Sequence, residues 1–173
     1  MGVAVTCFPL FRRPQLTVDT SIVALCKRKF DPGSNFWSLP GGKVKIGETI
    51  ISGAAREFLE ECGLEVNCLP LQPSIPAFCA TEAIYPHFHY ALAHVLALAP
   101  IHSEKGELPP LRAGDDADDV CWVRCCKELE KSPYSRLALP FLSDLPLVGP
   151  VESVVAQAKI IAEGVYHGQS DSY

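Results

Sequence analysis

Residues 50–62 constrain the fold of this chain most, because they predict a short helix with a defined start and end. Apolar residues recur every four positions, which is a helical period, at Ile50, Ala54, Phe58 and Cys62. Thr49 stands at the N-cap position, and Gly63 stands where helices commonly end in the left-handed conformation. The sequence therefore predicts a helix that is framed at both ends and has one apolar side.

Three glutamates of this helix are expected on one flank. Glu57, Glu60 and Glu61 stand at positions i, i+3 and i+4, so their carboxylates emerge close together. Charge runs of this kind are usually an acidic face in contact with water. The functional alternative is a divalent-cation site, where the metal turns the repulsion between carboxylates into attraction.

The rest of the chain alternates between strand-like and turn-forming segments. Composition favours strands, separated by turns rich in Gly, Pro and Asn, over residues 16–28, 36–39, 66–71, 75–80, 87–99 and 120–123. An acidic loop is expected over 104–119, and a second amphipathic helix is expected after Gly149-Pro150. Strands interleaved with two helices predict an α/β sandwich with a mixed sheet. We expect one domain over residues 1–173, with a flexible segment at 1–15.

Composition argues against several classes of function. The net charge of −5, from 15 Lys and Arg against 20 Asp and Glu, argues against an extended interface with the phosphate backbone of a nucleic acid. The longest apolar stretch, residues 90–101, is too short to span a bilayer, so no stable membrane insertion is expected. The eight cysteines come without a secretory signal or the density of a disulfide scaffold, which predicts reduced thiols in a cytoplasmic protein.

The first residues also satisfy a pattern for lipid attachment. Met1 to Thr6 match the signature for myristoylation of Gly2. One such chain anchors a protein only marginally, and the ordinary alternative is a frayed terminus.

A longer pattern surrounds the glutamates. Gly42 is followed after five residues by Glu48, and after seven more by Arg-Glu-Phe-Leu-Glu-Glu-Cys-Gly-Leu at 56–64. This stretch resembles the Nudix box, and every fixed position of that signature is filled. The segments at 37–42 and 118–123 resemble the family's context on both sides. The resemblance implies a Nudix-like α/β/α sandwich and hydrolysis of a pyrophosphate bond in a nucleoside diphosphate derivative.

The resemblance also implies a role for each residue of the box. Pyrophosphate is multiply anionic, so attack by water needs cations that neutralise its oxygens, and Mg²⁺ prefers oxygen ligands. The ligands of Mg²⁺, or of Mn²⁺ in its place, would be the carbonyl of Gly41 and the carboxylates of Glu57, Glu60 and Glu61. Glu57 or Glu61 would also orient or deprotonate the attacking water. Arg56 would hold a box carboxylate in place, and Glu48 would fix the loop by hydrogen bonds.

The general base in this family often comes from outside the box, and here the sequence leaves it open. The candidates are acidic residues of the predicted loop, namely Asp115, Asp116, Asp118 and Asp119, with Glu104 and Glu107 more remote. A run of acids is usually a solvated loop, so none of them is preferred.

Two further segments suggest a branch of the family. His89-Tyr90 before an apolar strand, and residues 113–117 before Trp122-Val123, resemble the ADP-ribose pyrophosphatases, which split ADP-ribose into AMP and ribose 5-phosphate. The first alternative is hydrolysis of nucleoside triphosphates to monophosphates and pyrophosphate. Dinucleoside polyphosphates, NADH and mRNA caps are further alternatives, as is a module that senses a nucleotide without cutting it. The family link also leaves a homodimer open.

Cations and aromatic rings are the expected contacts of such a substrate. The predicted substrate-binding residues are Lys27, Arg28, Trp37, His89 and Tyr90. The two cations would contact phosphate, and Phe36, Trp37 or Tyr90 would stack on the base. Core packing is the stronger alternative for Phe36 and Trp37. His87 and His89 share a strand face, but two histidines without a third ligand are more often ordinary polar residues than a metal site.

Overall fold

The computed structural model of the protein describes residues 1–11, 17–101, 107–125, 134 and 137–167. Among these residues, no helix is long and apolar enough to cross a membrane. In chain order the elements are β1 (Gly2–Phe11), β2 (Thr17–Val18), β3 (Ile22–Arg28), β4 (Trp37–Ser38), α1 (Ile50–Cys62), β5 (Asn67–Leu69), β6 (Cys79–Tyr85), β7 (Phe88–Pro100), β8 (Ala117–Arg124), a 3₁₀ turn (Leu142–Asp144) and α2 (Val151–His167).

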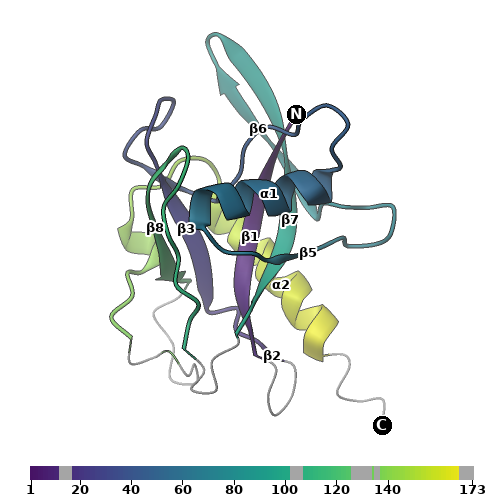
Figure 1. Ribbon diagram of the computed structural model, residues 1–173, viewed down its shortest axis with the longest axis vertical. Coiled ribbons are helices and arrows are strands. Elements are labelled where there is room, and N and C mark those ends of the chain that lie inside the picture. The colour runs from purple at the N-terminus through teal and green to yellow at the C-terminus, as the bar shows by residue number, and fades with distance from the viewer. Residues whose placement is uncertain (12–16, 102–106, 126–133, 135–136, 168–173) are drawn as a thin grey trace.

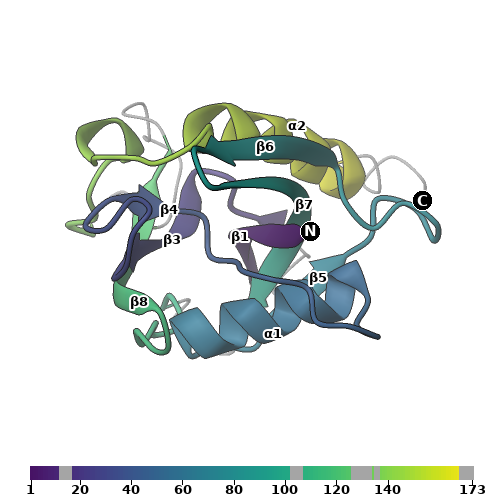
Figure 2. The ribbon, with the colours of Figure 1, turned by 90° about the horizontal axis from the view of Figure 1, so that it is seen from above.

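Two sheets lie between two helices, as Figure 2 shows. The larger sheet has the order β2-β1-β7-β5, with β6 also paired to β7, and the smaller sheet has the order β4-β3-β8. β1 runs parallel to β7 while the other pairs are antiparallel, so the larger sheet is mixed. α1 covers one side and α2 the other, which confirms the predicted α/β/α sandwich.

Alternating side chains of β1 supply both halves of the core. Val3 and Val5 pack in the cluster that includes Phe58 of α1. Phe8 packs in the other cluster, which includes Val154 of α2. Because successive strand residues face opposite sides, one strand that is buried on both faces packs against both helices.

β1 corrects the prediction of a flexible segment over residues 1–15. It is a central strand that pairs with β2 and, from Gly2↔Leu92 to Leu10↔Pro100, with β7. All of its residues except Phe11 are buried. The prediction was wrong because a strand buried on both faces lacks polar alternation, and its parallel partner lies far along the chain. Residues 12–15 of the predicted segment lie outside the described part.

Other strand boundaries also differ from the predictions. The single strand expected over 16–28 is two strands in different sheets. Between them, Asp19 Oδ1 accepts a hydrogen bond from the backbone N of Ser21 at 3.0 Å, which forms a local turn. The strand expected over 75–80 begins later, as β6, and the acidic loop ends sooner because β8 begins earlier than expected. Both predicted helices are confirmed as α1 and α2.

Candidate functional site

Hydrogen bonds fix the start and the end of α1. Thr49 Oγ1 accepts from the backbone N of Ser52 at 3.1 Å, and Ser52 Oγ accepts from the backbone N of Thr49 at 3.0 Å, which forms a capping box. Gly63 has a φ of 65°, and its N–H donates to the carbonyl of Leu59 at 2.9 Å. The helix therefore has the ends that the sequence predicts, and it lies across β1 and β7 (Figure 1).

Packing against the sheet decides how far each glutamate of α1 reaches water. Phe58 is fully buried, and the neighbouring Glu57 and Glu61 keep exposures of only 9% and 8%. The side chain of Glu60 is 37% exposed. The acidic face is therefore not simply solvated, because two of its three carboxylates are buried. Burying them costs free energy unless a partner group or a cation compensates.

A turn of two glycines lies directly against these carboxylates. The N–H of Gly41 donates to Glu61 Oε2 at 2.9 Å. A Cβ added at Gly41 would lie 2.1 Å from the carbonyl O of Val3, and a Cβ added at Gly42 would lie 2.5 Å from Glu57 Oε2. Only glycines leave room for β1 on one side of the turn and for the helix on the other.

Arg56 joins four groups around the turn. Its Nε and Nη2 donate to Glu48 at 2.8 and 2.9 Å, a bidentate pair. Its Nη1 donates to Glu57 Oε1 at 2.8 Å and to Glu60 Oε2 at 2.7 Å, and Nη2 also donates to the carbonyl of Lys43 at 3.0 Å. One guanidinium therefore ties the loop before α1 to two of the box carboxylates.

Burial and hydrogen bonding shift the pKa values of these carboxylates in opposite directions. Burial raises the pKa of Glu61 to about 7, although the hydrogen bond from Gly41 opposes this. Burial also raises the pKa of Glu57. The hydrogen bonds from Arg56 lower the pKa of Glu48 to about 2. The buried pair therefore favours additional positive charge nearby, beyond what Arg56 supplies.

The carboxylates have oxygens to offer to a divalent cation. Among the described residues, no group donates a hydrogen bond to Glu57 Oε2 or to Glu61 Oε1. Carboxylate oxygens are the ligands that Mg²⁺ prefers, so the donor set fits this ion. No three acidic, His or Cys side chains of the described part already converge as a ligand group. Arg56 Nη1 bonds both Glu57 and Glu60, so a cation would compete with Arg56 for their oxygens.

Sequence analysis missed one residue that touches the buried glutamate. The thiol of Cys26, on β3, donates to Glu61 Oε2 at 3.5 Å, and its sulfur also lies 3.5 Å from Ser38 Oγ. Cys26 alternates with Ile22 and Ala24, which face the cluster around α1. That alternation was the available signal, because it places the Cys26 side chain on the helix side of β3.

Comparison with known proteins decides the family. A family profile described as "NUDIX domain" matches residues 2–139. The chain belongs to the Nudix family. The ADP-ribose pyrophosphatase of Methanocaldococcus jannaschii is 32% identical over 118 residues, which cover 65% of this chain and 63% of that one. The oxidized purine nucleoside triphosphate hydrolase of Mus musculus is 50% identical over 54 residues, 31% of this chain and 35% of that one. The chain therefore spans less than two thirds of the length of these relatives.

Solved Nudix structures share the fold. A hydrolase of the Nudix family from Clostridium perfringens superposes with a TM-score of 0.59 at 12% identity, covering 95% of this chain and 96% of that one. The Nudix domain of Shewanella oneidensis NrtR, in complex with ADP ribose, superposes with a TM-score of 0.53 at 16% identity, covering 91% and 86%. Identities this low establish the fold alone.

The predicted Nudix-box residues come together in the structure. Glu48, Arg56, Glu57 and Glu60 are linked by direct hydrogen bonds, and Glu61 is linked to the glycine turn. The turn contacts Glu61 through the N–H of Gly41, so the use of its carbonyl as a metal ligand stays a prediction.

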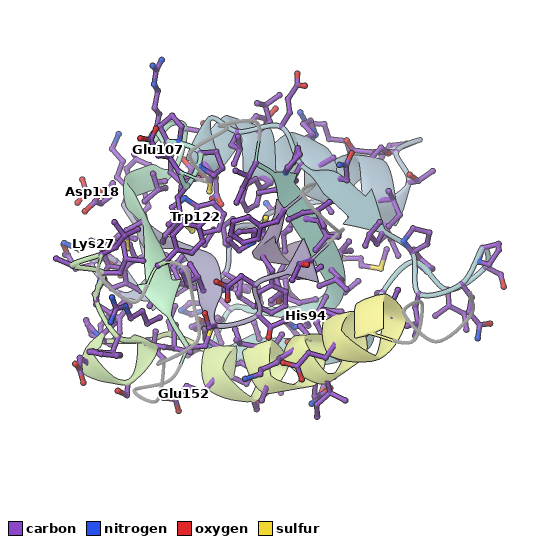
Figure 3. All side chains as sticks on the ribbon, turned by 90° about the horizontal axis from the view of Figure 1, so that it is seen from below. Lys27, His94, Glu107, Asp118, Trp122 and Glu152 are labelled. Carbon is purple, nitrogen blue, oxygen red and sulfur yellow. The ribbon has the colours of Figure 1, made fainter. Side chains whose placement is uncertain are left out.

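The predicted phosphate contacts lie at the end of β3, and the predicted stacking residue of β4 lies in the core. Lys27 Nζ lies 4.0 Å from Asp118 Oδ2, and both side chains are at the same edge in Figure 3. Arg28 Nε donates to the carbonyl of Pro32 at 2.8 Å. Trp37 is 9% exposed and packs in the cluster next to α2, which is the core alternative that the sequence left open. Phe36, by contrast, is 43% exposed.

His89 and Tyr90 lie on the β6–β7 hairpin and face opposite sides of it. His89 Nε2 lies 2.9 Å from Glu82 Oε1 on one face. The ring of Tyr90 lies 5.2 Å from the ring of Phe88, and Lys43 Nζ lies 5.7 Å from the centre of the Tyr90 ring. Of the two predicted residues, Tyr90 is therefore the one connected to the glycine turn, through Lys43.

The acidic loop is tied to the C-terminal end of α1. The N–H of Arg112 donates to the carbonyl of Cys62 at 2.9 Å, and the N–H of Gly114 donates to the carbonyl of Glu61 at 3.1 Å. A Cβ added at Gly114 would lie 2.6 Å from the carbonyl O of Glu60, so the close approach requires glycine. The acids that follow this contact are Asp115, Asp116, Asp118 and Asp119.

The structure singles out none of the predicted general bases. Asp118 lies near Lys27, and Asp119 Oδ1 accepts from the backbone N of Val120 at 2.8 Å. Glu107 lies on the loop before Arg112, and Glu104 lies outside the described residues. The identity of the base stays a prediction with several candidates.

Proposed function

We propose that this chain is an Mg²⁺-dependent hydrolase of the pyrophosphate bond in a nucleoside diphosphate derivative, with ADP-ribose as the first candidate substrate. One observation carries the proposal. Glu57, Glu60 and Glu61 share a flank of α1, and the two buried carboxylates each keep an oxygen that no described group donates to. Such an arrangement is costly by itself and becomes favourable with a cation and a polyphosphate in place.

The residues of the site divide the work of the proposed reaction. When bound, Mg²⁺ neutralises the phosphate oxygens and lowers the pKa of a coordinated water. Glu57, Glu60 and Glu61 would hold the ion. Arg56 would keep Glu57 and Glu60 oriented, and Glu48 would keep Arg56 in place through their bidentate pair. The proton of the attacking water would go to Glu57, Glu61 or an acid of the loop that docks on α1.

Two relatives support two substrates. The relative named ADP-ribose pyrophosphatase matches the larger part of the chain, 118 residues, which favours ADP-ribose. The relative named oxidized purine nucleoside triphosphate hydrolase has a higher identity of 50%, but over 54 residues only. Nudix substrate choice resides in loops outside the box, so the nucleoside triphosphate is the second candidate.

We also propose a cellular compartment and a binding partner for the chain. A small nucleotide is the proposed partner rather than a nucleic acid, in keeping with the net charge of −5. Cys7, Cys26 and Cys62 are buried free thiols, which supports the cytoplasm as the compartment. A homodimer stays a prediction, and light scattering of the purified chain would measure it.

A panel of nucleotides tests the proposal. The chain is incubated with ADP-ribose, NADH, dinucleoside polyphosphates and nucleoside triphosphates, with and without Mg²⁺, and products are identified by mass. We expect AMP and ribose 5-phosphate from ADP-ribose, only with Mg²⁺ or Mn²⁺. Glu61→Gln should lower turnover by about 10- to 100-fold. Glu152→Gln, at the start of α2, is the matched control (Figure 3).

Two results would contradict the proposed enzymatic function. Nucleotide binding without turnover of any panel member would favour a sensor. Undiminished turnover in Glu61→Gln would remove the role assigned to the helix, whatever the substrate.

A further inference from the structure

The β6–β7 hairpin extends beyond the N-terminal end of β1, the strand whose backbone is hydrogen-bonded to the glycine turn. β1 begins at Gly2, which pairs with Leu92, so the described residues of β7 before Ala91 pair only with β6. Figure 1 shows this hairpin rising from the body of the molecule near the N-terminus. The hairpin therefore presents two faces of its own, which the core does not cover.

One face of the hairpin is aromatic. Tyr85 pairs with Phe88 across the strands, and Tyr90 follows two residues later on the same face. Ring centres lie 4.7 Å apart for Tyr85 and Phe88 and 5.2 Å apart for Phe88 and Tyr90. Phe88 is 38% exposed. The opposite face carries the Glu82–His89 pair and Ile84. Tyr85 and Tyr90 are half-buried beside it. A continuous row of partly accessible rings commonly marks a binding site.

Lys43 lies at the Tyr90 end of this row of aromatic rings. Its Nζ lies 5.7 Å from the centre of the Tyr90 ring, within cation–π range. Its carbonyl accepts from Arg56, and it forms a bridge with Gly2. A Cβ added at Gly2 would lie 2.8 Å from a side-chain carbon of Leu92, so the surroundings of this bridge are tightly packed. The backbone that carries the Lys43 ammonium is therefore held in place.

Three cations lie close to the turn in the described part of the chain, and Lys43 differs from Arg56 and Lys45 in having no acidic partner there. Arg56 is bound by three glutamates, and Lys45 Nζ lies 3.7 Å from Glu60. Among the described residues, no acidic side chain lies within ion-pair distance of Lys43. Lys43 directly follows Gly42, which touches Glu57. An unpaired ammonium suits an anionic ligand, and the carboxylates could hold the same ligand only through a bound cation.

We propose that Lys43 and the aromatic face of Tyr85, Phe88 and Tyr90 form the subsite for the nucleoside monophosphate half of the substrate. The ammonium binds its phosphate, and the rings pack against its base. The inference rests on the proposed function for the position of the diphosphate at the carboxylates. A nucleotide fits better than a second protein chain, because the row ends at the ammonium of Lys43, and the backbone carbonyl of Lys43 is hydrogen-bonded to Arg56 of the carboxylate site.

Binding of two ligands, AMP and adenosine, separates the contribution of the Lys43 charge to affinity from that of the aromatic rings. Calorimetry on the full chain without added metal measures the affinities for AMP and for adenosine. Lys43→Gln should weaken AMP binding by about tenfold and leave adenosine unchanged, because only AMP carries the phosphate. Phe88→Leu should weaken both by about fivefold, since it keeps apolar bulk but removes the ring.

Two control variants test whether these effects are specific to the proposed subsite. Ile84→Thr alters the opposite face of the hairpin at a side chain that is 70% exposed, and it should change neither affinity. Lys29→Gln removes another lysine that lies over an aromatic ring, 5.3 Å from the centre of Phe30, and it should also have no effect.

Several results would overturn the inference. One is a wild-type chain that binds neither ligand, and another is an AMP affinity that survives Lys43→Gln. A third is a Phe88→Leu variant that keeps both affinities while its mass by light scattering drops from dimer to monomer, which would assign the aromatic face to a second copy of the chain. Because binding is measured without turnover, AMP binding with the expected losses would uphold the subsite even if the nucleotide panel gave no hydrolysis.

Discussion

At the scale of single residues, burial separates glutamates that look equivalent in the sequence. Glu57, Glu60 and Glu61 all belong to one acidic run, yet only Glu60 keeps a substantial exposure. The hydrogen bond from Gly41 and the contact with Cys26 fall on the same oxygen of Glu61. Glu61 is therefore held at one oxygen by groups from two other segments, and it is costly to ionise without a cation.

The raised pKa of Glu61 predicts a pH-dependent stability of the metal-free chain. Its folded pKa of about 7 exceeds the ordinary value of 4.5, so between these pH values the folded state holds a proton that the unfolded state releases. This contribution is present in full below pH 4.5 and is lost as the pH rises through 7, an effect of up to about 3 kcal/mol. Glu61→Gln should therefore be more stable than the wild type at pH 8, with a gap that shrinks toward pH 5.

Urea unfolding with a metal chelator at the two pH values measures this gap. Glu60→Gln, which removes a more exposed carboxylate from the same helix, is the control. An equal difference at both pH values would show that the titration of Glu61 does not contribute to stability.

The thiol of Cys26 predicts a graded effect on turnover. Cys26→Ala removes the donor to Glu61 Oε2 and should lower kcat by about threefold, in line with the loss of one modest hydrogen bond. Cys26→Ser keeps a donor and should restore most of the rate. Steady-state kinetics over a range of Mg²⁺ concentrations would report both. Equal rates for the alanine variant and the wild type would reduce Cys26 to a packing residue.

At the scale of elements, α1 is defined by interactions within a few residues of each end. The capping box uses Thr49 and Ser52, and the C-terminal end uses the left-handed Gly63. Contacts from the acidic loop then join the last turn to a distant part of the chain. The ends of the helix therefore depend on residues close in sequence, whereas its surroundings depend on contacts with segments far away in the chain.

The N-terminal capping box of α1 is expected to contribute measurably to the free energy of unfolding. Thr49→Ala should lower the free energy of unfolding by about 1 kcal/mol, because the backbone N of Ser52 loses its acceptor. Thr49→Ser keeps the oxygen and should stay near the wild type. Chemical denaturation monitored by circular dichroism would compare the three. A serine variant as unstable as the alanine variant would point to the lost methyl group instead of the cap.

At the scale of the whole molecule, β1 holds the two halves of the sandwich together. It lies between β2 and β7, sends alternate side chains to both core clusters, and accepts the glycine turn on its backbone. The backbone N of Val3 donates to the carbonyl of Gly42 at 2.9 Å, and the backbone N of Val5 donates to the carbonyl of Pro40 at 2.8 Å. The site is therefore built on the strand that sequence analysis expected to be flexible.

Phe8 tests the position of β1 in the core. Its side chain is fully buried, so Phe8→Ala should lower the free energy of unfolding by about 3–5 kcal/mol. Met1→Ala, at a residue that is 62% exposed, should have little effect. Urea unfolding of both variants makes the comparison. A Phe8 variant as stable as the Met1 variant would indicate that the segment is loose in solution.

The sequence by itself determined the helix over 50–62, its two ends and the common flank of its three glutamates. These features depend on helical period and on hydrogen bonds between near neighbours, so a short stretch of chain contains all the information. The tertiary structure decided which glutamates are buried, which of them Arg56 binds, and that Cys26 and Lys43 approach the site. It also made residues 2–11 a central strand. These outcomes depend on parallel pairing and on burial between segments far apart in the chain, which no local pattern of residues encodes.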